Sequence, residues 1–153
     1  MNNAPWMRQN IQGVISLIRK TEYVCVFLTG GIVYSMLEML WRGYTHWSMT
    51  VAGGLCFLMI HLLNQRMHDR DILLRCLIGC LIITGVEFFA GVIVNLWLGL
   101  DVWNYSGMAY NLLGQICPAF SLMWFLISFP ACALSGLFRR FFTALERRER
   151  IPA

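Results

Sequence analysis

The sequence predicts an all-α membrane protein of four transmembrane helices, arranged as two parallel-oriented hairpins and flanked by cytoplasmic amphipathic helices. Apolar residues make up 58% of the 153 residues and charged residues only 13%, whereas a soluble domain is roughly 45–50% apolar and one-quarter charged. Apolar segments long enough to cross a bilayer, about 20 residues each, occur four times. The basic residues lie almost entirely on one side of these segments. Lipid can cover this much apolar surface, and a soluble fold of this size cannot.

The four segments are about 23–41, 47–63, a span within 72–100, and about 112–138. The last two exceed the minimum length of a span, so we expect them to tilt or to extend into the interface. Pro118 lies near the start of the fourth segment, where a proline costs little. Pro130 lies inside it, and we expect it to kink or end the apolar part of that helix.

The chain divides into three parts: a cytoplasmic amphipathic segment at 1–20, the transmembrane domain at 21–138 and a basic cytoplasmic tail at 139–153. Apolar residues recur at helical spacing in both terminal parts, which is typical of helices that lie along a membrane surface. We expect no secretory signal peptide, because Arg19 and Lys20 precede an apolar run without a small-residue cleavage site.

The basic residues determine the predicted orientation. Of the 12 lysines and arginines, 11 lie before the first segment, between the second and third, or after the fourth, and only Arg42 lies on the other side. Cytoplasmic loops carry such an excess of positive charge. We therefore expect a multi-pass protein of the plasma membrane with both termini in the cytoplasm. The same placement argues against nucleic acid as a partner, because the charges serve topology and lipid headgroups.

Glu87 is the most informative single position. It lies near the middle of the third segment, where a charged side chain costs a few kcal/mol or more and usually faces a bundle interior or a water-filled cavity. The functional interpretation is a proton- or cation-coupled site, or a counter-ion for a bound ligand. The structural alternative is a protonated carboxyl group that is hydrogen-bonded to a neighbouring helix.

The first outer loop is rich in polar and aromatic side chains. Glu38 precedes Arg42 by four residues, which is the favourable order for an ion pair on a helix. This pair is either a simple interfacial salt bridge or part of a polar vestibule. An aromatic belt explains the neighbouring Trp and Tyr residues but not His46.

The second outer loop carries a similar set of side chains. Amides and carboxylates on several segments would converge on the outer half of the bundle, and glycines in the first three spans would let the helices approach closely. The candidate site residues from this region are Asn95, Asp101, Asn104, Tyr105, Asn111 and Gln115. Polar bonds between helices that serve only as structural glue are the alternative.

The remaining residue types indicate no enzymatic chemistry. The six cysteines lie in or beside apolar segments without zinc-type spacing, so we expect them to be small packing residues. His61 is expected at the cytoplasmic interface, with a relay role as the alternative. No P-loop, nucleophile elbow or metalloprotease motif occurs. We expect no enzyme activity, no cofactor and no bound metal.

The outer loops also suggest an internal repeat, in which Leu40–Met49 echoes Leu96–Ser106. Two parallel repeats are one way to build a transporter. Chance matching among Trp, Gly and Leu remains the alternative interpretation of this similarity.

Several of these motifs resemble those of the family named "putative ABC transporter permease", the CmpB-type small integral membrane proteins. The motifs are Glu38–Met49, Thr84–Phe88, Trp103–Ser106, Asn111–Cys117 and Trp124. The resemblance covers about residues 30 to 130 and implies a transport permease. It departs at Asn104, where the family typically has Asp, so a carboxylate role there would fall to nearby Asp101. ATP-driven activity would require a separate subunit.

Three functions are therefore open. The first is a small integral membrane transport protein or permease subunit with an outward-facing polar site and a mid-membrane carboxylate. The alternative is a non-transporting membrane scaffold, sensor or accessory subunit that binds a ligand or partner through its outer loops. A channel- or holin-like pore is a third. The partners we consider are membrane lipid, a second copy of the chain, and a separate ATPase or other membrane subunit.

Overall fold

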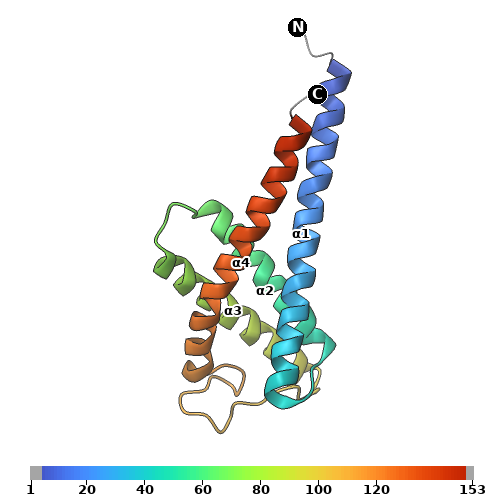
Figure 1. The fold of residues 1–153 in the computed structure, drawn as a ribbon. Coiled ribbons are helices and arrows are strands. Elements are labelled where there is room, and N and C mark those ends of the chain that lie inside the picture. The colour runs from blue at the N-terminus through green and yellow to red at the C-terminus, as the bar shows by residue number, and fades with distance from the viewer. Residues whose placement is uncertain (1–4, 151–153) are drawn as a thin grey trace.

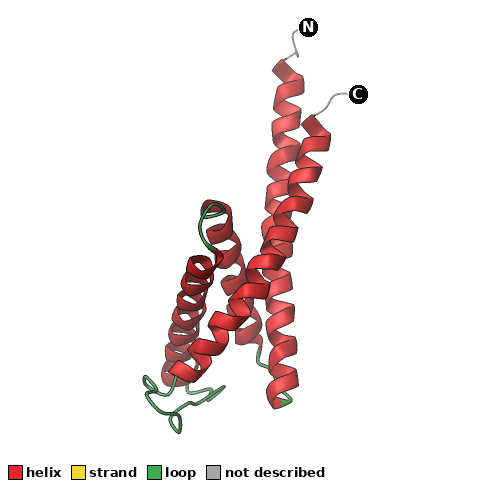
Figure 2. Ribbon diagram, turned by 60° about the vertical axis from the view of Figure 1, so that its left-hand side comes forward, coloured by secondary structure: helices red, strands yellow, loops and turns green. Residues whose placement is uncertain are grey.

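The computed structural model describes residues 5–150, which form four α-helices and no β-strand (Figures 1 and 2). The helices are α1 (Pro5–Arg42), α2 (Trp47–Arg66), α3 (Ile72–Gly91) and α4 (Pro118–Arg150), and α3 continues into a π-helical segment, η1 (Val92–Trp97). All four are long and apolar enough to cross a membrane. The predicted all-α architecture with four spans is therefore confirmed for the described part of the chain.

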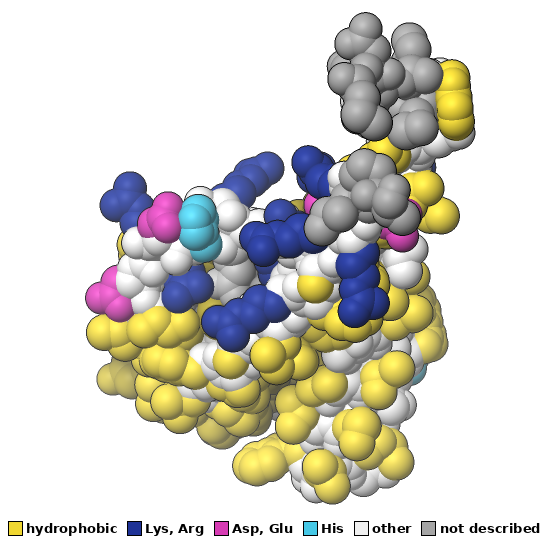
Figure 3. Space-filling view, turned by 45° about the horizontal axis from the view of Figure 1, so that its top comes forward, with side chains coloured by type: hydrophobic (Ala, Val, Ile, Leu, Met, Phe, Trp, Pro, Cys, Tyr) yellow, Lys and Arg dark blue, Asp and Glu magenta, His cyan; other side chains and the backbone are white. Residues whose placement is uncertain are grey.

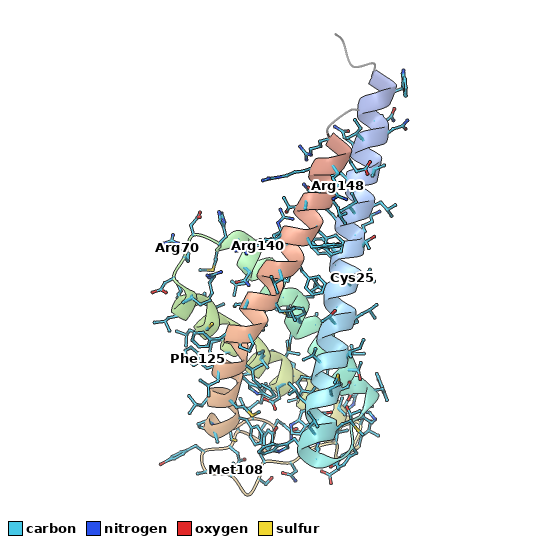
Figure 4. All side chains as sticks on the ribbon, in the orientation of Figure 1. Cys25, Arg70, Met108, Phe125, Arg140 and Arg148 are labelled. Carbon is cyan, nitrogen blue, oxygen red and sulfur yellow. The ribbon has the colours of Figure 1, made fainter. Side chains whose placement is uncertain are left out.

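The helices connect at two opposite ends of the molecule. Residues 43–46 and 98–117 form what we call the loop end. The two termini and residues 67–71 lie toward the other end, the terminal end (Figure 1). Figure 4 labels Met108 at the loop end and Arg148 near the termini. All predicted outer-loop residues therefore belong to one end of the bundle.

The structure differs from the predicted helix boundaries in two places. The fourth span begins at Pro118, not near residue 112, because the chain turns at Leu113 and Gly114, which both have positive φ angles. Pro118 then takes the first helical position, where its missing N–H is not needed. Pro130 lies inside α4 and does not end it, since the helix continues to Arg150.

The predicted flanking helices are not separate elements. α1 runs without a break through residue 20, and α4 runs through residue 138. With 38 residues, α1 is about 57 Å long, against a hydrocarbon core of about 30 Å. The two long helices extend side by side beyond the rest of the bundle (Figures 1 and 2), and Arg19 pairs with Glu146 at 2.9 Å. Residues 1–4 and 151–153 of the predicted terminal segments lie outside the described residues.

Glycines set the close packing of α1 against α2. A Cβ atom on Gly30 would lie 2.5 Å from the Cβ of Phe57 and 2.7 Å from the carbonyl of Gly53. Gly54 faces the backbone of Phe27 in the same way. Small residues at helix interfaces permit this approach in membranes, as predicted. Gly85 does not take part, because no atom lies within 4 Å of the position of its missing Cβ.

The surface separates apolar flanks from a basic terminal end. Large apolar side chains are exposed along helix faces, for example Leu77 and Leu81 on α3 and Leu122 and Leu126 on α4. Figure 3 shows Lys and Arg gathered around the end that carries the termini, above flanks of hydrophobic side chains. This distribution suits a chain whose flanks contact lipid.

Candidate functional site

A cavity of about 220 Å³ lies toward the loop end of the bundle. All four helices and the long loop contribute to its wall, and six of the 13 lining side chains are aromatic. The lining residues are Tyr34, Leu37, Glu38, Trp41, Arg42, Met49, Glu87, Trp103, Tyr105, Phe120, Met123, Trp124 and Ile127. Helical periodicity explains why these residues of α1 and α4 line the cavity. Within each helix they recur every three or four residues and so share one face.

Glu87 is the buried carboxyl group of this cavity, with only 4% of its surface exposed. Its two oxygens accept hydrogen bonds from different elements. Tyr105 in the long loop donates its O–H to Oε1 at 2.9 Å, and Trp124 on α4 donates its indole N–H to Oε2 at 2.7 Å. Within residues 5–150, no arginine, lysine or histidine forms an ion pair with Glu87. Its partners are neutral donors, so an ionised Glu87 would carry an uncompensated charge.

Two stacked aromatic pairs surround this carboxyl group. Tyr34 of α1 stacks on Trp124 with ring centroids 5.9 Å apart, and Tyr105 stacks on Phe120 of α4 at 4.4 Å. The first pair joins α1 to α4, and the second holds the long loop against the start of α4. The aromatic rings therefore hold the two donors of Glu87 in place.

Glu38 and Arg42 form an ion pair in the same cavity wall. Arg42 also donates to the carbonyl of Val102 in the long loop at 2.7 Å, and Thr45 donates to the second oxygen of Glu38 at 2.6 Å. The guanidinium carbon lies 4.9 Å from the centre of the Tyr44 ring. This pair thus has internal charge compensation, which Glu87 lacks, and it ties the end of α1 to the long loop.

A network of amides folds the long loop over the cavity. Asn95 donates to the carbonyl of Trp103 at 2.9 Å and to Gln115 at 2.8 Å, and it accepts from the amide of Val102 at 2.7 Å. The indole of Trp103 donates to the carbonyl of Gln115 at 3.0 Å. These bonds satisfy buried backbone groups that no helix or strand pairs. They hold the loop so that Tyr105 reaches α3.

Tyr105 keeps its proton in this setting. Its burial, and then the negative charge of Glu87, raise the pKa of the Tyr105 hydroxyl above its ordinary value. The hydroxyl is therefore a hydrogen-bond donor at any physiological pH.

The structure brings four of the ten predicted site residues into the cavity wall: Glu38, Arg42, Glu87 and Tyr105. The other six lie outside it. Asn95 and Gln115 belong to the amide network, and Asn111 bonds to the backbone of the same loop. His46 caps α2 through Ser48, Asn104 accepts from the amide of Ser106 at 2.9 Å, and Asp101 is exposed.

The sequence interpretation missed several aromatic residues of the cavity. Tyr34 and Phe120 were not singled out, and Trp124 entered only through the family resemblance. One signal was present for Tyr34, because it lies four residues before Glu38 and so on the same helix face. No local signal placed Phe120 against the ring of Tyr105.

A second buried polar cluster lies toward the terminal end. His61 is fully buried, not interfacial as predicted. Its Nε2 atom is 3.1 Å from Glu22, and its Nδ1 atom is 2.9 Å from the hydroxyl of Ser135. The second oxygen of Glu22 is buried and lies 3.5 Å from Arg139. This cluster joins α1, α2 and α4 on the terminal side of the cavity.

Two comparisons with known proteins bear on the chain. A family model described as "Putative ABC-transporter type IV", of the CmpB type, matches residues 47–148. The match covers Glu87, Tyr105 and Trp124, but it leaves out α1 with Tyr34 and Glu38. No solved structure matches the chain.

Proposed function

Because the chain belongs to the family described as "Putative ABC-transporter type IV", we propose that this multi-pass membrane protein is a small transport protein or permease subunit. The observation that carries the proposal is Glu87. It is a buried carboxyl group at an aromatic cavity, with two neutral donors and no cationic partner among the described residues. Uncompensated ionisable groups inside membrane bundles characteristically mark substrate, ion or proton pathways.

In the proposed orientation both termini lie in the cytoplasm and the loop end faces outward from the plasma membrane. The placement of 11 of the 12 basic residues toward the terminal end supports this. The cavity then receives its ligand from outside, and Glu87 lies inside the membrane. The two helical hairpins, α1–α2 and α3–α4, would have the same orientation, as parallel repeats do in some transporters.

The proposal also concerns partners. Residues 1–153 contain no P-loop motif, so ATP-driven transport would use a separate ATPase subunit. A four-helix bundle is narrow, and a translocation path is more easily formed between protomers of a homo-oligomer. No catalytic role is proposed for any residue.

A second candidate function is a non-transporting sensor or accessory subunit that binds its ligand at the same cavity. The packed core on the terminal side of the cavity favours this sensor or accessory role. Ile60, Cys76 and Cys132 are buried there, and the cluster of Glu22 and His61 follows toward the terminal end. These buried groups lie between Glu87 and the terminal end.

Flux through liposomes tests the proposal. The purified protein is reconstituted, a potassium diffusion potential is imposed, and proton movement is followed with an entrapped pH-sensitive dye, alongside uptake of a panel of radiolabelled solutes. Wild type and Glu87→Gln are compared with Glu149→Gln, which changes an exposed carboxylate on the terminal part of α4.

We expect flux from wild type and from Glu149→Gln, and its loss in Glu87→Gln. Absence of flux under every gradient, from wild-type protein of native helix content, would refute transport and leave the sensor or accessory role.

A further inference from the structure

A second cavity, of about 290 Å³, adjoins the cavity that contains Glu87, which we call the carboxylate cavity. Tyr34, Leu37, Trp124 and Ile127 line both. The second cavity, which we call the apolar groove, follows α1 and α4 from the aromatic wall toward Gly30, Ala131 and Leu134, and residues of α2 and α3 form its floor. Its lining contains no charged residue. The two cavities therefore form one site with a charged part and an apolar part.

The carboxyl groups of the carboxylate cavity favour a cationic ligand. Glu38 is paired with Arg42, whereas Glu87 has only the two neutral donors, so an ionised Glu87 leaves one net negative charge. A buried charge is stable only when it is paired. For an ionised Glu87 the missing partner is a monovalent positive group, and a bound ligand can supply it.

The aromatic walls of the carboxylate cavity favour an organic cation as the ligand. The rings of Tyr34, Trp124, Tyr105 and Phe120 surround Glu87. Aromatic faces attract alkylated ammonium groups, and such cages are the usual site for quaternary ammonium ligands. A hard metal ion needs several oxygen ligands, whereas one of the two carboxylates in this cavity wall is already paired with Arg42. Because Glu87 already accepts two hydrogen bonds, the cation does not have to donate one.

The size of the two parts indicates that one ligand occupies both. A typical ligand site measures about 300–1,000 Å³. The cavity at Glu87 falls below that range, the apolar groove lies at its lower limit, and the two combined fall inside it. A ligand held only at Glu87 would leave the apolar groove empty, although the groove opens from the same aromatic wall.

We propose that this site binds an amphiphilic organic cation, with its ammonium group in the aromatic cavity at Glu87 and its apolar tail in the groove between α1 and α4. The proposal deepens the proposed function, since it names the ligand class of the same site, but it requires binding and not transport. A membrane lipid tail, taken up without regard to charge, is the competing occupant of the groove.

Equilibrium binding of radiolabelled decyltrimethylammonium to the full chain in nanodiscs tests the proposal. Empty nanodiscs give the amount that partitions into lipid. Unlabelled tetramethylammonium, decyl sulfate and decyl maltoside serve as competitors that separate the head from the tail. The variants are Glu87→Gln with its exposed control Glu149→Gln, and Ala131→Leu with Ala144→Leu as the control, since Ala131 lines the groove and Ala144 is exposed on the same helix.

We expect saturable binding that falls about 30-fold or more in Glu87→Gln, because one partner of a buried charge pair is removed. Ala131→Leu should weaken decyltrimethylammonium but not tetramethylammonium, and both controls should bind as wild type does. Tetramethylammonium should compete, and decyl sulfate and decyl maltoside should not.

Competition by decyl sulfate and decyl maltoside, without competition by tetramethylammonium, would overturn the proposal and assign the groove to lipid tails. Absence of saturable binding would also overturn it, even if proton flux through Glu87 is observed. Binding without any flux would instead support this inference and refute only the proposed transport.

Discussion

Tyr105→Phe isolates one hydrogen bond to Glu87. The substitution removes the phenol oxygen, while the ring can keep its stacking on Phe120, whose centroid lies 4.4 Å away. It deletes the 2.9 Å bond from the Tyr105 hydroxyl to Oε1, so the carboxyl keeps only the bond from Trp124. A hydrogen bond to a charged group contributes about 1.5–3 kcal/mol, and one between neutral groups about 0.5–1.5 kcal/mol. The size of the loss of unfolding free energy in Tyr105→Phe therefore indicates whether Glu87 is ionised or neutral.

The assay is reversible unfolding in mixed micelles, followed by circular dichroism as the denaturing detergent increases. Tyr110→Phe is the matched control, because Tyr110 lies in the same loop and is 91% exposed, and surface changes stay within about 0.5 kcal/mol. We expect a loss above about 1.5 kcal/mol for Tyr105→Phe if Glu87 is ionised. Equal effects of the two substitutions would refute the hydrogen bond and with it the role of the loop at the site.

Three further predictions use the same unfolding assay. Gly30→Ala should lower the free energy of unfolding by about 1–3 kcal/mol, because its Cβ would lie 2.5 Å from a facing side chain of α2. The control Gly136→Ala, with no atom within 4 Å of the added Cβ, should raise it by up to about 1 kcal/mol. A stabilising effect of Gly30→Ala would contradict the observed helix contact. Asn104→Asp should change stability by less than about 0.5 kcal/mol, because a carboxylate oxygen accepts the same bond from the loop backbone, and a larger loss would point to a role for the amide. Arg42→Gln alone should cost more than Arg42→Gln combined with Glu38→Gln, since the single change leaves a part-buried carboxylate without its cation; the reverse order would exclude the ion pair.

The Asn104 result bears on the one departure from the family pattern. Its side chain accepts a hydrogen bond within the loop and does not line the cavity. An aspartate could take the same place. The structure thus gives Asn and Asp an equivalent local role here, and it does not require exposed Asp101 to replace a lost carboxylate.

Several features of the fold could be predicted because their signals are local. Hydropathy over about 20 residues identifies a span wherever its neighbours lie. Helix α2 begins at Trp47 as predicted, and α3 with η1 lies within the predicted range 72–100. The start of α4 could not be predicted in this way. Leu112 and Leu113 are as apolar as a helix requires, yet backbone turns at positive φ hold them outside it.

The site was only partly predictable, since polar residue types do not indicate which face they occupy. Asn95 and Gln115 were assigned to the candidate site because they are polar and lie beside the second outer loop. The structure assigns these two amides to the loop backbone, where unpaired peptide groups need partners. His61 looks interfacial by position, but the long helix α4 brings Ser135 beside it and buries it.

The sequence by itself determined the number of apolar segments and the polarity of the two ends, and it singled out Glu87 as a carboxyl group in the middle of a segment. Each of these follows from the cost of placing particular residue types in lipid. Only the tertiary structure decided that Tyr105 and Trp124 are the partners of Glu87 and that an apolar groove continues from the same wall. The physical reason is that these contacts depend on how helices rotate and cross and on how a 20-residue loop folds back, and no short window of sequence contains that information.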